Sequence, residues 1–251
     1  MELLDRLQTR FPEHYRHGNI LMIHGDNMDL MAELGEKEIP LAIVDPPYGI
    51  GEDSDKISEY NSKPCESWTS RRPKKYDKKE WDNKPPSQEY FNELIRVSKK
   101  QIIWGGNYFT DKLPASGGWI VWDKMVVMPT FSDGELAWCS FGDSVKFARF
   151  LWAGYRKCEE VERFHPTQKP VALYKWLLSR YAKPTDIILD THGGSGSIVI
   201  ACHDLGFPLV WIELDKDYYT DAVKRFKTHA SQQQLFTPLD VKQPDKQINL
   251  L

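Results

Sequence analysis

A strand, a glycine-rich turn, a helix and a second strand follow one another within residues 187–213, and this order constrains the fold more than any other feature. A short apolar run ends at Asp190, and the turn after it opens a helix expected over Ile198–Leu205. The next apolar run, Leu209–Ile212, predicts the second strand. Buried strands that alternate with helices are typical of a parallel sheet. The sequence therefore predicts an α/β fold.

The turn in this unit has the features of a nucleotide-binding site. Gly193, Gly194 and Gly196 let the backbone approach a ligand closely, and the helix that follows supplies free N–H groups at its N-terminus. Glu213 closes the second strand, at the position where a ribose diol is bound in folds of this type. The dinucleotide fingerprint is incomplete, because Val199 stands where its third small residue belongs. A flexible Gly/Ser linker is the alternative, but two apolar strands do not frame a linker.

A second motif, Asp45-Pro46-Pro47-Tyr48, directly follows the apolar run Leu41–Val44. The exocyclic amine of adenine or cytosine is a poor nucleophile, because its lone pair is delocalised into the ring. The Asp45 carboxylate and the Pro46 carbonyl would accept its two N–H groups and favour a tetrahedral nitrogen in the transition state. Proline fixes φ and has no N–H, which keeps the carbonyl available. Tyr48 would stack on the base. The alternative is a proline turn with an incidental aspartate.

Three motifs occur in one order along the chain: Asp45–Tyr48, then His165–Pro170, then Asp190–Gly196. With them the chain, from about Ile20 to Arg225, resembles the permuted beta class of DNA amino-methyltransferases, which use S-adenosyl-L-methionine. The resemblance implies a Rossmann-like methyltransferase fold of the α/β class. We therefore expect a mostly parallel sheet with helices on both faces, a circularly permuted motif order, and both ligands at the carboxyl ends of the strands.

The resemblance also implies which residues form the site. The catalytic, amine-binding residues are Asp45, Pro46, Pro47 and Tyr48. The cofactor-binding residues are Asp26, Thr167, Lys169, Asp190, His192, Gly193, Gly194, Ser195, Gly196, Glu213 and Leu214. No metal is expected, because the sulfonium group is already a strong electrophile.

Four of these positions carry more specific expectations. Thr167 and Lys169 would lie near the methionine carboxylate of the cofactor. Asp26 corresponds to an acidic position that meets the cofactor's adenine, and its alternative role is the N-cap of a helix over Met28–Leu34. Many relatives carry Pro-Phe after the motif aspartate, whereas His192 stands at the second of these positions here. His192 either touches the cofactor or is only packed and hydrogen-bonded.

The net charge of −3 is unexpected for a protein that binds DNA, so any DNA-binding surface must be local. Residues Lys63–Lys84 hold eight basic and four acidic side chains, with Trp68, Tyr76 and Trp81 between them. Basic groups neutralise phosphates, and aromatic rings stack on exposed bases. The resemblance places a DNA-contacting loop here, at about residues 52–86, and a solvated loop is the alternative. The expected DNA-binding residues are Arg71, Arg72, Lys74, Lys75, Lys78 and Lys79.

The length of 251 residues suits one sizeable α/β core. We expect one methyltransferase domain over residues 1–230, a loosely ordered tail over 231–251, and a short recognition insert at about 142–164. Other helices are expected from Ser87, over Pro170–Ala182 and over Tyr218–Phe226, and other strands near 20–24, 101–104, 119–123, 135–141 and 145–152. The chain has no C-x-x-C pair, no apolar run of 18 residues and no signal pattern. These absences predict a cytoplasmic protein with reduced thiols and no zinc site.

Together these features predict a methyltransferase that acts on the N6 amine of an adenine flipped out of double-stranded DNA. Adenine is preferred because the cytosine-N4 enzymes of the family usually carry serine where Asp45 stands. One alternative is an N4-cytosine enzyme, and another methylates RNA or a glutamine side chain, although relatives acting on glutamine usually carry asparagine there. A catalytically idle DNA-binding subunit with the same fold is the third. The sequence leaves a homodimer open.

Overall fold

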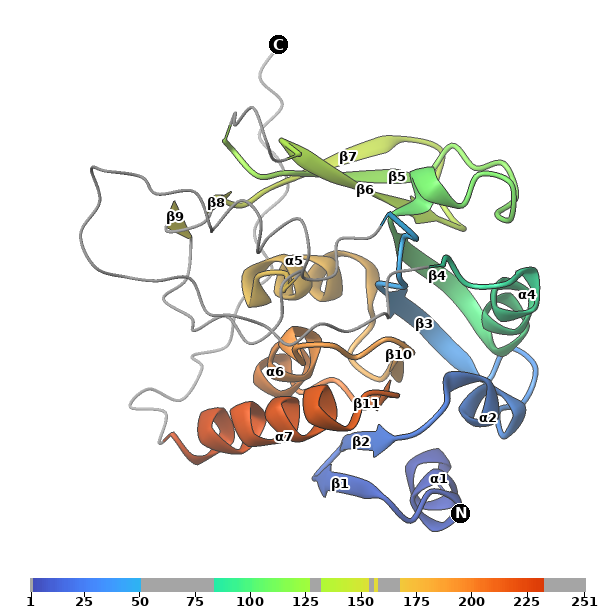
Figure 1. The fold of residues 1–251 in the computed structure, drawn as a ribbon, viewed down its shortest axis with the longest axis vertical. Helices are drawn as coiled ribbons and strands as arrows, with labels where there is room; N and C mark the ends of the chain where they lie inside the picture. Colours follow the sequence, from blue (N-terminus) through green and yellow to red (C-terminus); the bar gives the residue numbers. More distant parts are fainter. Residues whose placement is uncertain (1, 51–83, 127–131, 154–155, 158–167, 233–251) are drawn as a thin grey trace.

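A nine-stranded mixed sheet organises the part of the chain that the structure describes (Figure 1). The computed structural model describes residues 2–50, 84–126, 132–153, 156–157 and 168–232. The strands lie in the order β1-β2-β11-β10-β3-β4-β6-β5-β7. Their bounds are β1 (His14–His17), β2 (Ile20–His24), β3 (Ile39–Val44), β4 (Ser98–Trp104), β5 (Trp119–Asp123), β6 (Gly134–Cys139), β7 (Val145–Arg149), β10 (Ile188–Asp190) and β11 (Leu209–Glu213).

The centre of the sheet is parallel. Strands β2, β11, β10, β3 and β4 all run in one direction. Antiparallel pairs flank them, with β1 on β2 at one side and β6 on β4 at the other. Strand β5 is antiparallel to β6, and β7 is parallel to β5. The predicted mostly parallel sheet is therefore confirmed.

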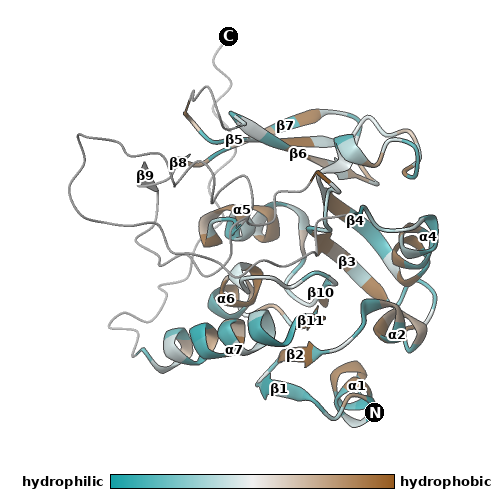
Figure 2. Cartoon of the chain, in the orientation of Figure 1, coloured by the Kyte–Doolittle hydropathy of each residue, from teal (hydrophilic) through white to brown (hydrophobic). Residues whose placement is uncertain are grey.

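Helices cover both faces of this sheet, because successive residues of a strand point to opposite sides. In β2, Ile20 and Met22 pack in one hydrophobic cluster with α5, α6 and α7, whereas Leu21 and Ile23 pack in another with α1, α2 and α4. In Figure 2 the central strand β3 is mostly hydrophobic in colour, whereas β1 is hydrophilic and α7 carries many hydrophilic residues. The helix bounds are α1 (Leu3–Arg10), α2 (Asn27–Ala32), α4 (Gln88–Val97), α5 (Val171–Tyr181), α6 (Ser197–Leu205) and α7 (Lys216–Ser231).

The two predicted motifs meet because their strands are neighbours. In the parallel pair of β3 and β10, Leu41 lies opposite Ile188 and Ala42 opposite Leu189. The segments that follow the two strands therefore leave the sheet at the same edge. The strand before Asp45 precedes the strand of the glycine turn in the sequence, which is the permuted order that the resemblance implies.

Several elements differ from the predictions made from sequence, mostly at their ends. Helix α1 and strand β1 are not among the predicted elements, although Leu4 and Leu7 give α1 a buried apolar face. Helix α7 begins two residues before Tyr218, because the Asp215 side chain caps it by accepting the N–H groups of Asp217 and Tyr218 at 2.9 and 3.0 Å. Pro170 is the N-cap of α5 and does not lie within its first turn. Strand β7 stops at Arg149, before the short pair β8 (Trp152–Ala153) and β9 (Arg156–Lys157).

Parts of three predicted segments lie outside the described residues. They are most of the DNA-contacting loop (residues 51–83), the tail from residue 233, and residues 154–155 and 158–164 of the recognition insert. The described part of that insert contains β7, β8 and β9. Among the described helices, none has the length and apolar character needed to cross a membrane.

Candidate active site

A cavity of about 560 Å³ opens at the carboxyl edge of the parallel strands. Its walls are the segments that follow β2, β3, β10 and β11, together with the start of α5. This volume is typical of a small-molecule site. Nine of the residues predicted for the site line it: Asp45, Pro47, Lys169, His192, Gly193, Gly194, Ser195, Glu213 and Leu214.

The glycine turn forms one wall, and close contacts explain its composition. A Cβ atom on Gly193 would lie 2.0 Å from Cε2 of Trp211, which is far too close for any side chain. Gly194 and Gly196 have φ values of 50° and 69°, a region that favours glycine. Gly196 occupies the N-cap position of α6 and is not itself among the lining residues. The turn therefore presents backbone to the cavity.

Glu213 faces the same cavity from the end of β11. Its Oε2 accepts the N–H of Gly194 at 2.7 Å, and its Oε1 accepts the N–H of Asp215 at 2.8 Å. Burial raises the pKa of this carboxyl group, although these backbone donors oppose the shift. Each carboxylate oxygen can accept a second hydrogen bond. Glu213 is therefore oriented by the backbone and keeps acceptor capacity for a diol.

Asp190 stabilises the start of the glycine turn through a hydrogen bond. Its Oδ1 accepts the N–H of His192 at 3.1 Å, and the side chain is buried outside the set of lining residues. Burial raises its pKa to about 8, so the group is mostly protonated at neutral pH. In this structure Asp190 holds the start of the turn and does not reach the cavity.

His192 both lines the cavity and belongs to a hydrogen-bonded network. Its Nε2 lies 3.2 Å from Nδ2 of Asn27, and its Nδ1 lies 3.1 Å from Oγ1 of Thr191, which in turn lies 2.7 Å from the Tyr90 hydroxyl. Asn27 Nδ2 also donates to the Thr191 carbonyl, which fixes the amide orientation. Nε2 must then accept, so the proton of the neutral ring is on Nδ1. Burial lowers the pKa of His192 to about 3.

The remaining predicted cofactor residues are Asp26, Leu214 and Thr167. Asp26 is the N-cap of α2, where its Oδ1 accepts the N–H of Met28 at 2.7 Å, and it is not among the lining residues. The capping role given as an alternative is the one that the structure contains. Leu214 lines the rim and is 67% exposed. Thr167 lies outside the described residues.

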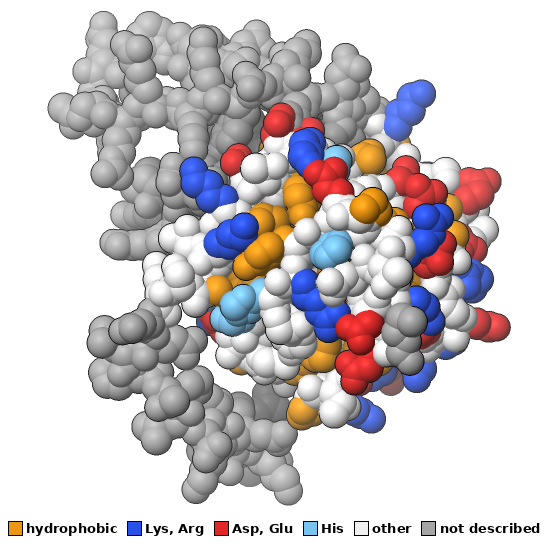
Figure 3. All heavy atoms as spheres, turned by 90° about the horizontal axis from the view of Figure 1, so that it is seen from below, with side chains coloured by type: hydrophobic (Ala, Val, Ile, Leu, Met, Phe, Trp, Pro, Cys, Tyr) orange, Lys and Arg blue, Asp and Glu red, His pale blue; other side chains and the backbone are white. Residues whose placement is uncertain are grey.

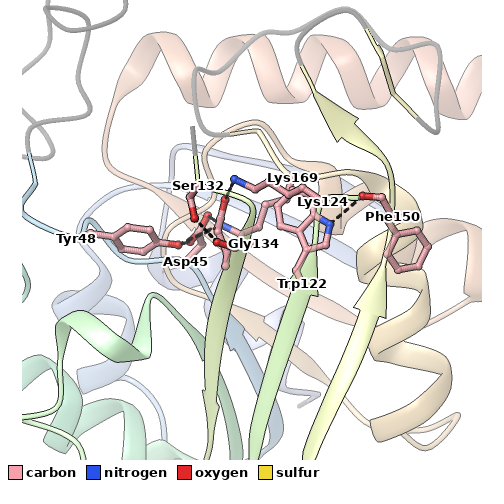
Figure 4. A network of polar contacts seen from close by, with 9 residues as sticks. Asp45, Tyr48, Trp122, Lys124, Ser132, Gly134, Phe150 and Lys169 are labelled. Atoms are coloured by element: carbon pink, nitrogen blue, oxygen red, sulfur yellow. Dashed lines mark hydrogen bonds and ion pairs between the residues drawn. The ribbon is translucent and has the colours of Figure 1, made fainter. Parts of the chain in front are cut away.

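Asp45 is held by two neighbours (Figure 4). Its Oδ1 accepts the Tyr48 hydroxyl at 2.8 Å, and its Oδ2 accepts the Lys169 ammonium at 2.5 Å. Burial raises the pKa of Asp45, opposed by Lys169 and supported by the carboxylate of Glu135. Pro47 lines the cavity beside Asp45, while Pro46 is buried and is not among the lining residues.

Lys169 lines the cavity, and its ammonium group contacts the residues around Asp45. Its Nζ lies 2.5 Å from Asp45 Oδ2, 3.0 Å from Glu135 Oε2 and 3.3 Å from the Tyr48 hydroxyl oxygen. An ammonium group has three N–H donors, and three acceptors surround this one. Lys169 lines the cavity, but in this structure it binds Asp45 and Glu135, and no donor is left for a cofactor carboxylate.

Glu135 and Lys124 complete this network and were missed by sequence reasoning. Lys124 Nζ lies 2.8 Å from Glu135 Oε1. Burial alone would raise the pKa of Glu135, but the ammonium groups of Lys169 and Lys124 outweigh it and bring the pKa to about 2. Glu135 comes from β6, whose antiparallel pairing with β5 places it opposite Trp122. No motif surrounds it, and only the tertiary pairing brings it to Asp45.

Tyr48 is packed against a second tyrosine. Its ring stacks on Tyr108, with 5.0 Å between the ring centroids and an 18° angle between the planes. Tyr108 lies in the 3-10 turn η1 (Gly106–Tyr108) and is 43% exposed. A Cβ atom on Gly105 would lie 2.2 Å from Tyr48 Cε1, so glycine is required where this ring crosses the end of β4. The ring of Tyr48 is therefore fixed by protein contacts on at least one face.

The predicted DNA-binding residues Arg71, Arg72, Lys74, Lys75, Lys78 and Lys79 all lie outside the described residues. On the face of the molecule in Figure 3, the basic side chains of the described part are interspersed with acidic ones. Within that part of the chain, no three His, Cys, Asp or Glu side chains gather in a group that could hold a metal ion.

Comparisons with known proteins show similarity to DNA methyltransferases. The model of the N6/N4 methyltransferase family, described as DNA methylase, matches residues 138–224. The Type II methyltransferase M2.DpnII of Streptococcus pneumoniae is 22% identical over 262 residues, covering 85% of this chain and 92% of that protein. The Type II methyltransferase M2.LlaDCHI of Lactococcus lactis is also 22% identical, covering 87% of this chain and 93% of that protein.

Two solved structures share the fold. The structure of a PvuII DNA methyltransferase, named as cytosine-N4-specific, has a TM-score of 0.56 at 14% identity and covers 86% of this chain and 90% of its own. The M1.HpyAVI–SAM complex has a TM-score of 0.50 at 20% identity and covers 82% and 99%. These likenesses support the Rossmann-like methyltransferase fold. With the family match over residues 138–224 and relatives that align along most of its length, the chain is similar to the N6/N4 DNA methyltransferases.

Proposed function

We propose that this protein transfers a methyl group from S-adenosyl-L-methionine to the N6 amine of an adenine that is flipped out of double-stranded DNA. One observation carries the proposal. The Asp45 carboxylate lines the same cavity as the glycine turn and Glu213. An amine-binding group and a nucleoside-binding group therefore share one site.

The residues of the cavity fit the cofactor. Glu213 has free acceptor capacity for the two ribose hydroxyls, and the glycine turn offers backbone to the ligand without side chains. Bound there, the cofactor supplies an electrophilic methyl group. The exposed side chain of Leu214 at the rim offers an apolar surface to the base of a nucleoside. His192 is neutral, so it adds no positive charge that would repel a sulfonium.

Asp45 would bind the target amine. Its oxygens already accept from Tyr48 and Lys169, but each has a second lone pair for an N–H of the base. As the amine nitrogen attacks, positive charge develops on it, and the adjacent carboxylate stabilises that charge. The nitrogen then loses a proton, and Asp45, whose pKa is raised, is the nearest group that can take it. Tyr48 orients Asp45 through its hydroxyl.

The choice of adenine rests on Asp45 and on the family resemblance. Both amines require the same acceptors, so the physical chemistry of the site does not separate them. In relatives that methylate cytosine N4, serine usually takes the place of this aspartate. A cytosine-N4 product is the main alternative outcome of the test below.

DNA would be held by the basic loop at about residues 52–86. Its charge is the reason, because eight basic side chains in Lys63–Lys84 supply a local cationic surface on a chain of net charge −3. Replacing Arg71, Arg72, Lys74 and Lys75 by alanine should lower the salt dependence of DNA binding by about 0.9 log units for each lost phosphate contact. An unchanged salt slope would place DNA elsewhere.

The proposal is tested by expression in a host that lacks DNA methylation, followed by digestion of its DNA to nucleosides and mass spectrometry. We expect N6-methyladenine, absent from cells that express the Asp45→Ala variant. N4-methylcytosine as the sole product would overturn the choice of base. No methylated base, from a protein that still binds the cofactor, would favour an idle DNA-binding subunit.

A further inference from the structure

Asp45 and three neighbouring charged groups, all buried or half-buried, form a chain in which negative and positive charges alternate (Figure 4). The chain runs from Asp45 to Lys169 at 2.5 Å, from Lys169 to Glu135 at 3.0 Å, and from Glu135 to Lys124 at 2.8 Å. Lys169 has a side-chain exposure of 2%, and the two carboxylates have 18% and 23%. Solvent therefore screens these interactions little, and each charge strongly affects the next.

Glu135 competes with Asp45 for the ammonium of Lys169. With both carboxylates present, the group of Asp45, Lys169 and Glu135 carries a net charge of −1. Without Glu135, Asp45 and Lys169 would form a neutral pair, and the ammonium could donate more of its protons to Asp45. A neutralised carboxylate is a weaker acceptor for an amine that becomes positive as it attacks. The carboxylate of Glu135 thus limits how far the Lys169 ammonium neutralises Asp45.

We propose that Glu135 is a positioning residue for methyl transfer: by sharing the Lys169 ammonium it limits how far Lys169 neutralises Asp45, which leaves the Asp45 carboxylate a stronger acceptor for the target amine. This inference rests on the proposed function of Asp45. Glu135 itself is not among the residues that line the cavity, so it acts through Lys169 and not on a ligand. Lys124, on its other oxygen, holds it in place.

A purely structural ion pair is the competing explanation, and the rate at saturating substrate, read together with its pH dependence, separates the two. The groups that act on Asp45 are Lys169, Glu135 and Tyr48, and its charge is also felt by Tyr174 of α5 and Asp190 of β10. Removing the negative charge of Glu135 should lower the pKa of Asp45. Removing the positive charge of Lys169 should raise it. A purely structural ion pair would show these shifts without a loss of rate at saturating substrate in a folded variant.

The first experiment measures single-turnover methyl transfer at saturating DNA and cofactor in the Glu135→Gln variant. We expect a rate about tenfold lower. This loss is smaller than that from removing a group that contacts the transition state directly. The acid limb of the pH–rate profile should move to lower pH. Cofactor affinity should stay within about twofold, since Glu135 does not reach the cavity. The matched control is Glu33→Gln, which breaks the exposed pair with Arg10 at the far end of α2 and should match wild type.

The second experiment is a double-mutant cycle with Lys169→Met, a change that keeps the side-chain volume. If Glu135 acts through Lys169, then adding Glu135→Gln to Lys169→Met should cost less than about twofold, or should improve the rate by removing a repulsion next to Asp45. An equal loss in both backgrounds would overturn the inference. So would an unmoved acid limb in Glu135→Gln.

Folding is checked by thermal unfolding, and Lys124→Met is the substitute if Glu135→Gln does not fold. Removal of Lys124 leaves more of the Glu135 charge to act on Asp45, so the acid limb should move to higher pH, opposite to Glu135→Gln. An unmoved limb in Lys124→Met would also overturn the inference. Failure of the proposed function is distinct, because the wild-type protein itself would then transfer no methyl group to DNA.

Discussion

The two sides of the cavity are built by different means. On the cofactor side, backbone N–H groups hold Glu213. The glycine turn and Glu213 both come from one continuous stretch, residues 190–215. On the Asp45 side, charged side chains hold one another. Lys169 is 124 positions from Asp45 in the sequence, and Glu135 and Lys124 come from a different part of the sheet.

This difference has consequences for chemistry. The backbone N–H donors on the cofactor side do not titrate, so pH acts there through the carboxyl groups of Glu213 and Asp190, whose pKa values burial raises. The Asp45 side depends on the charges of its neighbours, and each of them changes the proton affinity of the next. A group that must accept a proton during a reaction benefits from such tuning. A group that only binds a diol, as proposed for Glu213, does not need its proton affinity adjusted.

The largest effect should come from Asp45→Ala, which breaks one side and spares the other. We expect methyl transfer to fall by at least about 100-fold, the scale for the loss of one preorganised transition-state partner. Cofactor affinity should stay within about threefold of wild type, because the glycine turn and Glu213 are unchanged. Transfer of a radiolabelled methyl group and calorimetric titration measure the two quantities. Asp221→Ala, an exposed aspartate of α7, is the control. Wild-type transfer in Asp45→Ala would remove Asp45 from the mechanism.

Gly193→Ala should damage the cofactor side through shape alone. The new Cβ would lie 2.0 Å from the Trp211 ring, so the turn must move, at a cost of about 1–3 kcal/mol of unfolding free energy and an expected loss of tenfold or more in cofactor affinity. Denaturant titration and calorimetry test both.

The matched control for this substitution is Gly206→Ala. Gly206 has a φ of 77° but nothing within 4 Å of a Cβ, and it ends the same helix α6 away from the cavity. Alanine there should cost about 1–2 kcal/mol of stability and leave cofactor affinity unchanged. If the two variants bind cofactor equally well, the close approach at Gly193 does not matter for binding.

Glu213→Ala should weaken cofactor binding by tenfold or more, since hydrogen bonds to a charged acceptor contribute roughly 1.5–3 kcal/mol each. The rate at saturating cofactor should change little, because Asp45 and its neighbours are intact. Glu213→Gln, which keeps one carbonyl acceptor, should fall between alanine and wild type. Unchanged affinity in the alanine variant would exclude Glu213 from the ribose site.

The same contrast explains how much could be predicted from sequence. The parallel sheet, most of its helices and the turn after Asp190 follow from hydrophobic periodicity and local glycine patterns, and the fold prediction is confirmed. Helix α7 starts earlier than predicted because Asp215 caps it, and an aspartate in that position is itself a sequence signal for a helix start. For Asp26 the sequence allows a cofactor contact or an N-cap, and the structure contains the N-cap.

The Asp45 network could not be predicted in this way. Glu135 meets Lys169 only because β6 pairs antiparallel with β4, and no local pattern encodes that pairing. Lys169 was expected at the cofactor through the resemblance, and the structure places its ammonium between two carboxylates. Side chains that are brought together from distant segments depend on the tertiary structure, and their partners decide what they do.

The smallest predicted effect concerns His192, which belongs to the cofactor side yet can titrate. Its pKa is lowered by burial to about 3 from an ordinary value of 6.5, so the unfolded chain takes up a proton near pH 6 that the folded protein refuses. The unfolding free energy should therefore decrease as the pH is lowered. Between pH 7 and pH 6, His192 should account for about 0.7 kcal/mol of this decrease. His192→Phe should show a fall that is smaller by this amount in denaturant titrations at the two pH values. An equal fall in wild type and His192→Phe would mean that the ring accepts a proton in the folded state, and that the cofactor side is less fixed than its backbone contacts imply.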